Sequence, residues 1–158
     1  MKQGGWLFAV LLLAALLAGA KLLRDARADN TRAPEGLQSG KVADLLAPAL
    51  KQKRPVALVL TYDAECCETT RDFFARHRAG VKRIQQRYSD KVSFVWLDIA
   101  VYDQSDRSGL NKLGRDYGVT SVPALLLLDG AGKLAAKFEG ELDEQAVRDA
   151  LDRLTRGK

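Results

Sequence analysis

Residues 117–130 read Tyr-Gly-Val-Thr-Ser-Val-Pro-Ala-Leu-Leu-Leu-Leu-Asp-Gly, and this stretch decides the fold. Gly118 is a typical helix stop, because glycine readily adopts the left-handed backbone conformation that ends many helices. Pro123 opens an apolar run with the length and character of a buried strand. Asp129 and the glycines after it favour a tight turn, since these residues tolerate positive φ. The stretch therefore predicts a helix end, a strand over 123–129 and a hairpin.

The hairpin leads into an antiparallel strand over 133–139 and then into a last helix. That helix is indicated by an apolar stripe at helical spacing, formed by Leu142, Ala146, Val147, Ala150, Leu151 and Leu154. On the other side of the stretch, Leu110, Leu113 and Tyr117 mark the short helix that Gly118 ends. The polar segment 102–108 before this helix is expected to be a loop.

Two strands and two helices come earlier in the chain. Apolar spacing predicts a helix over 41–51, a strand over 55–62, a long helix over 68–88 and a strand over 92–99. We expect an α/β fold, with a mixed central sheet of about four strands flanked by helices on both faces. The β-α-β unit implies parallel central strands, and the hairpin adds an antiparallel edge. Candidate core residues are Phe73, Phe74, Val81, Ile84, Phe94 and Trp96.

Cys66 and Cys67 are the only cysteines, and they lie between the predicted strand 55–62 and the predicted helix 68–88. A thiol at a helix start is exposed to the positive end of the helix dipole, which favours the reactive thiolate. Free cysteines are often small buried hydrophobes instead. The acidic neighbours Asp63, Glu65 and Glu68 argue against burial here, and they also oppose the effect of the dipole on the thiolate.

Composition excludes several functional classes. The net charge of the chain is +5. Basic residues are interleaved with acids along the chain, which favours a solvated surface over nucleic-acid binding. Two cysteines without a histidine cluster exclude a disulfide framework and an ordinary zinc site. We therefore expect no metal ligands, no cofactor and no nucleic-acid partner.

The N-terminus differs from the rest of the chain. Residues 4–20 carry no charge and are rich in leucine and alanine, which is typical of a signal peptide or a membrane anchor. Residues 1–24 are therefore predicted to be one of these two, and polar residues 25–40 to be a linker. The folded domain is expected over 41–158, either held at the membrane and facing outside the cytoplasm, or secreted after cleavage.

The predicted order of elements, together with two local motifs, resembles the thioredoxin family. One motif is Leu-Thr-Tyr-Asp-Ala-Glu-Cys-Cys-Glu-Thr at 60–69, and the other is the stretch 117–130. The resemblance extends over 41–154 and includes Gly140 just after the last strand. It implies a thioredoxin-like fold, a cis-proline at Pro123 and a partner-binding edge at Val122 and Pro123.

The active-site motif departs from the family's Trp-Cys-Gly-Pro-Cys. The resemblance puts Cys66 at the attacking cysteine and Thr69 at the resolving one, so the usual disulfide cannot form. Leu60 replaces the family's buried acid, and Trp96 replaces the lysine that pairs with it. A bridge between Cys66 and Cys67 would be strained, because adjacent Cα atoms are only about 3.8 Å apart and disulfides need roughly 4.4–6.8 Å.

Other residues near the cysteines have two interpretations each. Thr69 could donate a hydrogen bond to the Cys66 thiolate, since residues three apart share a helix face, or it could be an exposed first-turn threonine. Glu68 could accept a proton, or it could simply interact favourably with the positive end of the helix dipole. His77, the only histidine, is expected at the surface and too far along the helix to act as a base.

Three functions follow from these residues. The leading hypothesis is an extracytoplasmic thiol-disulfide redox protein, an atypical oxidoreductase without a Cys-x-x-Cys motif, which forms a mixed disulfide between Cys66 and a protein partner. Cys67 or an external thiol would resolve it. The alternatives are a non-enzymatic binding module for an envelope partner, and capture of a soft metal by Cys66 and Cys67 with further ligands from outside the chain.

Overall fold

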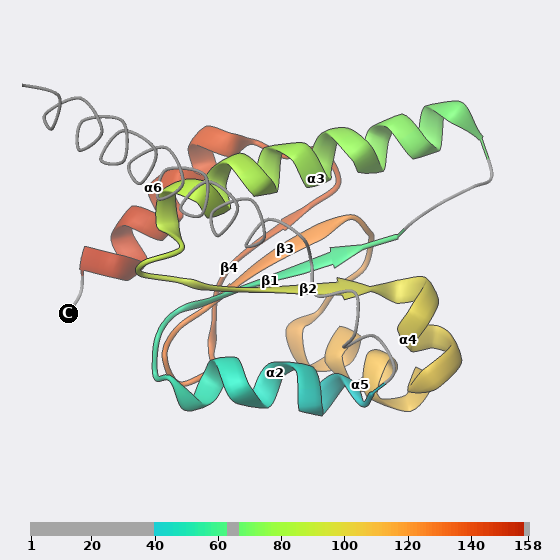
Figure 1. Ribbon diagram of the computed structural model, residues 1–158, viewed down its shortest axis with the longest axis horizontal. Coiled ribbons are helices and arrows are strands. Elements are labelled where there is room, and N and C mark those ends of the chain that lie inside the picture. Colours follow the sequence, from blue (N-terminus) through green and yellow to red (C-terminus); the bar gives the residue numbers. More distant parts are fainter. Residues whose placement is uncertain (1–39, 63–66, 157–158) are drawn as a thin grey trace, which may run out of the picture. The chain divides into compact units, whose positions relative to one another are not determined.

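The computed structural model describes residues 40–62 and 67–156, which belong to one compact unit, Gly36–Lys158. The predicted signal peptide or anchor over 1–24 lies outside the described residues, as does nearly all of the predicted linker. Within 40–62 and 67–156 no helix is long and apolar enough to cross a membrane. The elements (Figure 1) are α2 Val42–Lys51, β1 Val56–Thr61, α3 Glu68–Tyr88, β2 Ser93–Asp98, α4 Ile99–Ser105, α5 Arg107–Tyr117, β3 Ala124–Leu128, β4 Leu134–Glu139 and α6 Glu144–Arg156.

The four strands form one mixed sheet in the order β2-β1-β3-β4. β1 pairs with β2 in parallel and with β3 in antiparallel orientation, and β3 and β4 form the predicted hairpin. The prediction of a mixed α/β sheet is confirmed. The expectation of parallel central strands is wrong, because the central pair β1 and β3 is antiparallel and the parallel partner β2 lies at an edge.

Helices cover both faces of the sheet (Figure 1). α3 and α6 pack on the face that carries Val59 and Leu127, whereas α2, α4 and α5 pack on the face that carries Leu58 and Leu126. Every residue of β1 and β3 is buried, so these strands lack the polar alternation of a half-exposed strand. The central strands form the core. Burial of each large apolar side chain stabilises the fold by roughly 1.5–3 kcal/mol.

Most predicted elements are confirmed within a residue or two. α3 begins and ends as predicted, with Phe74, Val81 and Ile84 buried, although Phe73 is only half-buried. Phe94 and Trp96 are partly buried at the rim of the core. Gly118 ends α5 with φ 61° and ψ 38°, the left-handed conformation expected of a helix stop.

Segment 102–108 is not the predicted loop but parts of two short helices, α4 and α5. Its polar residues include a helix cap: Asp106 accepts a hydrogen bond from the backbone of Gly109 at 3.0 Å and another from Val42 at 2.9 Å. Asp98 caps α4 in the same way, through Ala100. Tyr102 is 1% exposed and anchors α4 in the core, so tertiary packing stabilises a segment whose local pattern is polar.

Candidate functional site

Cys67 lies at the start of α3, where it is the N-terminal capping residue. Its backbone is extended, its side chain is exposed, and its carbonyl accepts the first helical hydrogen bond, from Arg71. The thiol therefore lies beside the unpaired N–H groups of the first turn, an environment that favours a thiolate. Cys66 is within 63–66, outside the described residues, so its position and role remain predictions.

The described thiol has a hydroxyl neighbour that sequence reasoning missed. Cys67 Sγ lies 3.0 Å from Thr70 Oγ1, and either atom could be the donor. Thr69, the threonine singled out from the sequence, is exposed, and its expected contact with Cys66 lies outside the described residues. The rule that residues three apart share a helix face would have found Thr70, had it been applied to Cys67 as well as to Cys66.

Pro123 lies at the end of the sheet where β1 leaves toward the cysteines. Leu60 pairs with Ala124 across the antiparallel β1–β3 ladder, and continuing this register by one residue sets Pro123 opposite Thr61. The Val122–Pro123 peptide bond is cis, the geometry that the resemblance implied. Pro123 is buried and Val122 half-buried. Thr61 Oγ1 is buried at the same end without a hydrogen-bond partner among the described residues.

The loop before Pro123 is held by one carboxylate of β4. Glu139 accepts hydrogen bonds from the Thr120 backbone at 2.6 Å, the Thr120 hydroxyl at 3.0 Å and the Ser121 backbone at 3.3 Å. The bond from the Thr120 backbone is the main reason that the pKa of Glu139 is lowered. Lys137 approaches the same carboxylate at 3.5 Å and donates to the Gly118 carbonyl. Nothing in the sequence pattern pointed to Glu139, because its partners lie 18 and 19 residues away.

Leu60 and Trp96 do not face each other. Leu60 is 2% exposed and belongs to the core cluster under α2, α4 and α5, whereas Trp96 packs on the cluster under α3 and α6. The strand register pairs Trp96 with Val59, one residue away from Leu60. The Trp96 indole donates to Gln85 on α3 at 3.1 Å. Leu60 itself, an apolar side chain packed in that cluster, supplies no proton acceptor to the site.

His77 is not the surface residue expected from the sequence. It is 3% exposed on the inner side of α3, and its Nδ1 is buried without a partner in the described part of the chain. Burial lowers the pKa of His77 to about 4, and the charge of Arg78 acts in the same direction. The side chain lines a small pocket between α3 and the segment joining β4 to α6. Burial therefore favours the neutral form of the His77 imidazole.

Acidic and thiol side chains do not gather into a metal site within 40–62 and 67–156. No three or more His, Cys, Asp or Glu residues in that part of the chain are placed to hold an ion. The soft-metal site predicted at Cys66 and Cys67 includes Cys66, which lies outside the described residues.

Comparison with known proteins identifies relatives that are named as thioredoxin-like or thiol:disulfide interchange proteins. No protein-family model matches the chain. It is 28% identical over 119 residues to "Thioredoxin-like protein HCF164, chloroplastic" of Arabidopsis thaliana. The matched residues cover 73% of this chain and 42% of the relative. The rice protein of the same name is 25% identical over 140 residues, or 89% of this chain and 44% of the relative.

A third relative carries a more explicit description. "Thiol:disulfide interchange protein HelX" of Rhodobacter capsulatus is 38% identical over 47 residues, which is 30% of this chain and 27% of that protein. The chain thus spans less than half the length of the curated relatives that it matches.

Proposed function

Because this chain is a thioredoxin-like protein, we propose that it is a thiol-disulfide redox protein that works outside the cytoplasm through a mixed disulfide at Cys66. The observation that supports this most is the exposed Cys67 thiol at the start of α3, next in the chain to Cys66. The relatives named as thioredoxin-like and thiol:disulfide interchange proteins support the redox class. The uncharged segment 4–20 supports export or anchoring at a membrane.

The proposed reaction is thiol–disulfide exchange with a partner protein. The Cys66 thiolate attacks one sulfur of the partner's disulfide, which forms a mixed disulfide and releases the other partner sulfur as a thiolate. An external thiolate then attacks the Cys66 sulfur, forms a new mixed disulfide with it and releases the partner's remaining sulfur as a thiolate. A second external thiolate attacks the external sulfur of that mixed disulfide and frees the Cys66 thiolate. Attack by Cys67 on Cys66 also releases the partner, but it leaves a strained bridge between adjacent residues, which is easily reduced.

The partner's chain is proposed to bind at Val122 and Pro123 as an added strand. Backbone groups beside an exposed sheet end can pair with an extended peptide, and the sequence of that peptide then matters less than its backbone. Glu139 supports this role, since its hydrogen bonds to Thr120 and Ser121 hold the loop that presents Val122.

General reductase activity is expected to be weak. Leu60 places an apolar side chain where the family has a buried acid, and Thr69 stands where the family has its resolving thiol. A protein of this kind forms mixed disulfides more readily than it turns them over. Turnover therefore depends on Cys67 or on a thiol supplied from outside the chain.

Trapping of the mixed disulfide tests the proposal. The full chain and its Cys66→Ser and Cys67→Ser variants are incubated with insulin and analysed by mass spectrometry without reductant. We expect the Cys67→Ser variant to accumulate a covalent adduct and the Cys66→Ser variant to form none. Adducts on neither variant would sink the redox proposal, and adducts on the Cys66→Ser variant alone would move the attacking role to Cys67.

A second candidate is a binding module that no longer turns over, and the apolar environment of Leu60 favours it. This candidate predicts that a Cys66→Ser/Cys67→Ser variant still captures the partner with unchanged affinity. The redox proposal predicts instead that the wild-type chain forms a covalent adduct with the partner, which the binding module does not. Measuring both affinity and adduct for one partner separates the two.

A further inference from the structure

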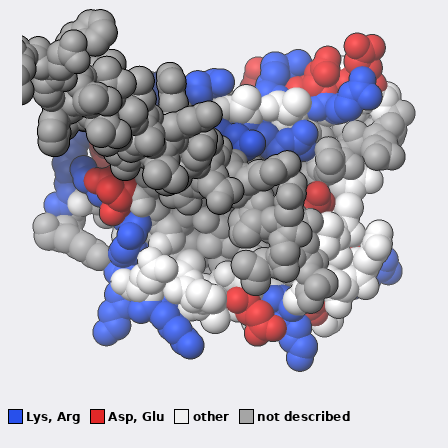
Figure 2. Space-filling model, viewed as in Figure 1, with Lys and Arg blue, Asp and Glu red and all other residues white. Residues whose placement is uncertain are grey.

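The excess of basic over acidic residues in the folded domain lies on α3. It holds six basic residues and two acids, an excess of four, whereas residues 40–158 together hold 20 basic residues and 17 acids, an excess of three. The rest of the domain therefore has one more acid than base. Figure 2 shows blue side chains along the top of the view, where α3 runs in Figure 1, together with red ones, mainly toward the right. The basic residues of α3 are Arg71, Arg76, Arg78, Lys82, Arg83 and Arg87.

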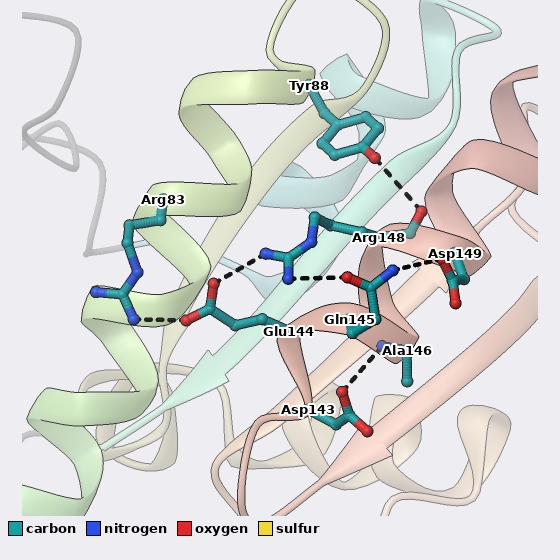
Figure 3. A network of polar contacts seen from close by, with 8 residues as sticks. All are labelled: Arg83, Tyr88, Asp143, Glu144, Gln145, Ala146, Arg148 and Asp149. Carbon is teal, nitrogen blue, oxygen red and sulfur yellow. Dashed lines mark hydrogen bonds and ion pairs between the residues drawn. The ribbon is translucent and has the colours of Figure 1, made fainter.

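Several basic residues of the other helices form ion pairs, whereas most of those of α3 form none with a described residue. In α5, Lys112 pairs with Asp116 at 2.6 Å, and in α6, Arg156 pairs with Asp152 at 3.1 Å. The ion pair that α3 makes among the described residues joins Arg83 to Glu144 at 2.5 Å, with Arg148 on the other side of that carboxylate (Figure 3). Arg71, Arg76 and Lys82 are exposed and form no ion pair with any described residue. A surface of this kind favours an anionic partner.

The basic residues lie in two rows along the exposed side of α3. At 100° per residue, Ala75, Ala79 and Gln86 share the centre of this side, and all three are exposed. Arg71, Arg78 and Lys82 lie to one side of this central row. Arg76, Arg83 and Arg87 lie to the other. The small side chains of Ala75 and Ala79 between two rows of long basic side chains let both rows reach a plane.

We propose that this exposed side of α3, the basic face, docks on the anionic headgroups of a lipid bilayer. The surface is a straight helix of 21 residues, or about 30 Å, and it offers two parallel rows of charge to a plane. Segment 4–20 is predicted to be a signal peptide or a membrane anchor, and as an anchor it would bring such a plane within reach. Each basic residue held near an anionic bilayer strengthens binding about fivefold.

The direction of the charge along α3 has a consequence for the thiols. Glu68 and Asp72, the two acids of the helix, lie at the end that begins with Cys67, and the basic residues extend from there to Arg87. An anionic surface therefore attracts the middle and the C-terminal end of α3 and repels its start. Docked in this way, the domain keeps Cys67 turned away from the headgroups and reachable by a protein partner beside the membrane.

Amine labelling of the full chain in vesicles tests the docking. The protein is reconstituted in phosphatidylcholine vesicles with and without 30% phosphatidylglycerol and treated with a water-soluble acylating reagent, and labelled lysines are quantified by mass spectrometry. We expect Lys82 to be labelled at least threefold more slowly with phosphatidylglycerol and Lys112 at the same rate in both vesicles. Added salt should abolish the difference, because it screens exposed charges.

Two matched triple variants make the result specific. Arg71→Gln/Arg76→Gln/Arg87→Gln removes three charges from the basic face and should abolish the protection of Lys82. Arg107→Gln/Lys112→Gln/Arg115→Gln removes three from α5 and should preserve it. Equal labelling in both vesicle types, or equal loss with both triples, would overturn the proposal. Protection that needs added polyglutamate instead of lipid would overturn it in favour of an acidic polypeptide. Because every variant retains Cys66 and Cys67, failure here leaves the redox proposal standing.

Discussion

Cys67 Sγ and Thr70 Oγ1 lie 3.0 Å apart in the first turn of α3. Once the thiol is deprotonated, only the hydroxyl can donate, so the contact stabilises the thiolate at the place where the helix dipole does the same. The hydroxyl at the predicted resolving position, Thr69, is exposed and is the natural control for this contact.

Replacing Thr70 by valine should slow the reaction of Cys67 with iodoacetamide at neutral pH by about threefold to tenfold, or about 0.7–1.4 kcal/mol. A hydrogen bond to a charged group contributes roughly 1.5–3 kcal/mol, and exposure to water weakens this one. The rate is measured in a Cys66→Ser background, so that only Cys67 reacts. Thr69→Val should leave the rate unchanged. An equal decrease in both variants would show that the effect comes from the helix start in general.

Replacing His77 by leucine should remove a pH dependence of the free energy of unfolding. His77 has a folded pKa of about 4, below its unfolded value of about 6.5, so the unfolded chain takes up its proton first as the pH falls. The wild type therefore loses stability between pH 6.5 and 4, by about 2–3 kcal/mol at pH 4.5 relative to His77→Leu. Urea unfolding of both proteins at pH 7 and 4.5 measures this difference, and carboxylates common to both cancel. Parallel pH profiles would contradict the burial of a neutral His77.

Replacing Gly80 by alanine should be about 1–3 kcal/mol less favourable than a Gly→Ala change at an open helix position, because the new Cβ would meet Leu142 Cδ2 at 2.5 Å. Gly114→Ala is the matched control: it also lies within a helix, and no atom is within 4 Å of its new Cβ. That variant should gain about 0.5–1 kcal/mol from the better helix propensity of alanine. Thermal unfolding compares the two.

The same clash can be removed from the other side. In a Leu142→Ala background, Gly80→Ala should no longer be destabilising, since the methyl group then occupies the space that Leu142 filled. A persistent loss of stability in this background would mean that the packing of α3 against the β4–α6 segment depends on more than this one contact.

Replacing Glu139 by glutamine should loosen the loop that precedes Pro123. The carboxylate accepts three hydrogen bonds from Thr120 and Ser121, and one amide oxygen cannot replace both carboxylate oxygens. Amide hydrogen exchange of Thr120 and Ser121 should become several-fold faster. Glu141→Gln, two residues along, should leave this exchange unchanged.

The same loop should respond to acid in the wild type. The folded pKa of Glu139 is lowered, so the stabilisation is present above its unfolded value of about 4.5 and is lost as the pH falls through the folded value. Exchange at Thr120, corrected for the intrinsic effect of pH, should therefore accelerate as the pH falls below the unfolded pKa of about 4.5 in the wild type and show no such step in Glu139→Gln.

Much of the candidate site could be located from sequence, but its contacts could not. The apolar run before Cys66 and the helical pattern after Cys67 were enough to place the cysteines between β1 and α3, and Pro123 was recognisable from its place before β3. Glu139 and Thr70 were missed for different reasons. Glu139 reaches the loop only because the β3–β4 hairpin folds back, whereas Thr70 was within reach of a local rule.

The sequence by itself determined the elements and their order, because an apolar run, a helical period or a glycine stop acts over a few neighbouring residues. Tertiary structure alone decided that β1 and β3 form an antiparallel centre, that α4 forms around the buried Tyr102, and that His77 is enclosed. The physical reason is common to all three. Burial and strand partners depend on which distant segments pack together, and a polar residue such as His77 is buried when its neighbours enclose it, whatever its own preference.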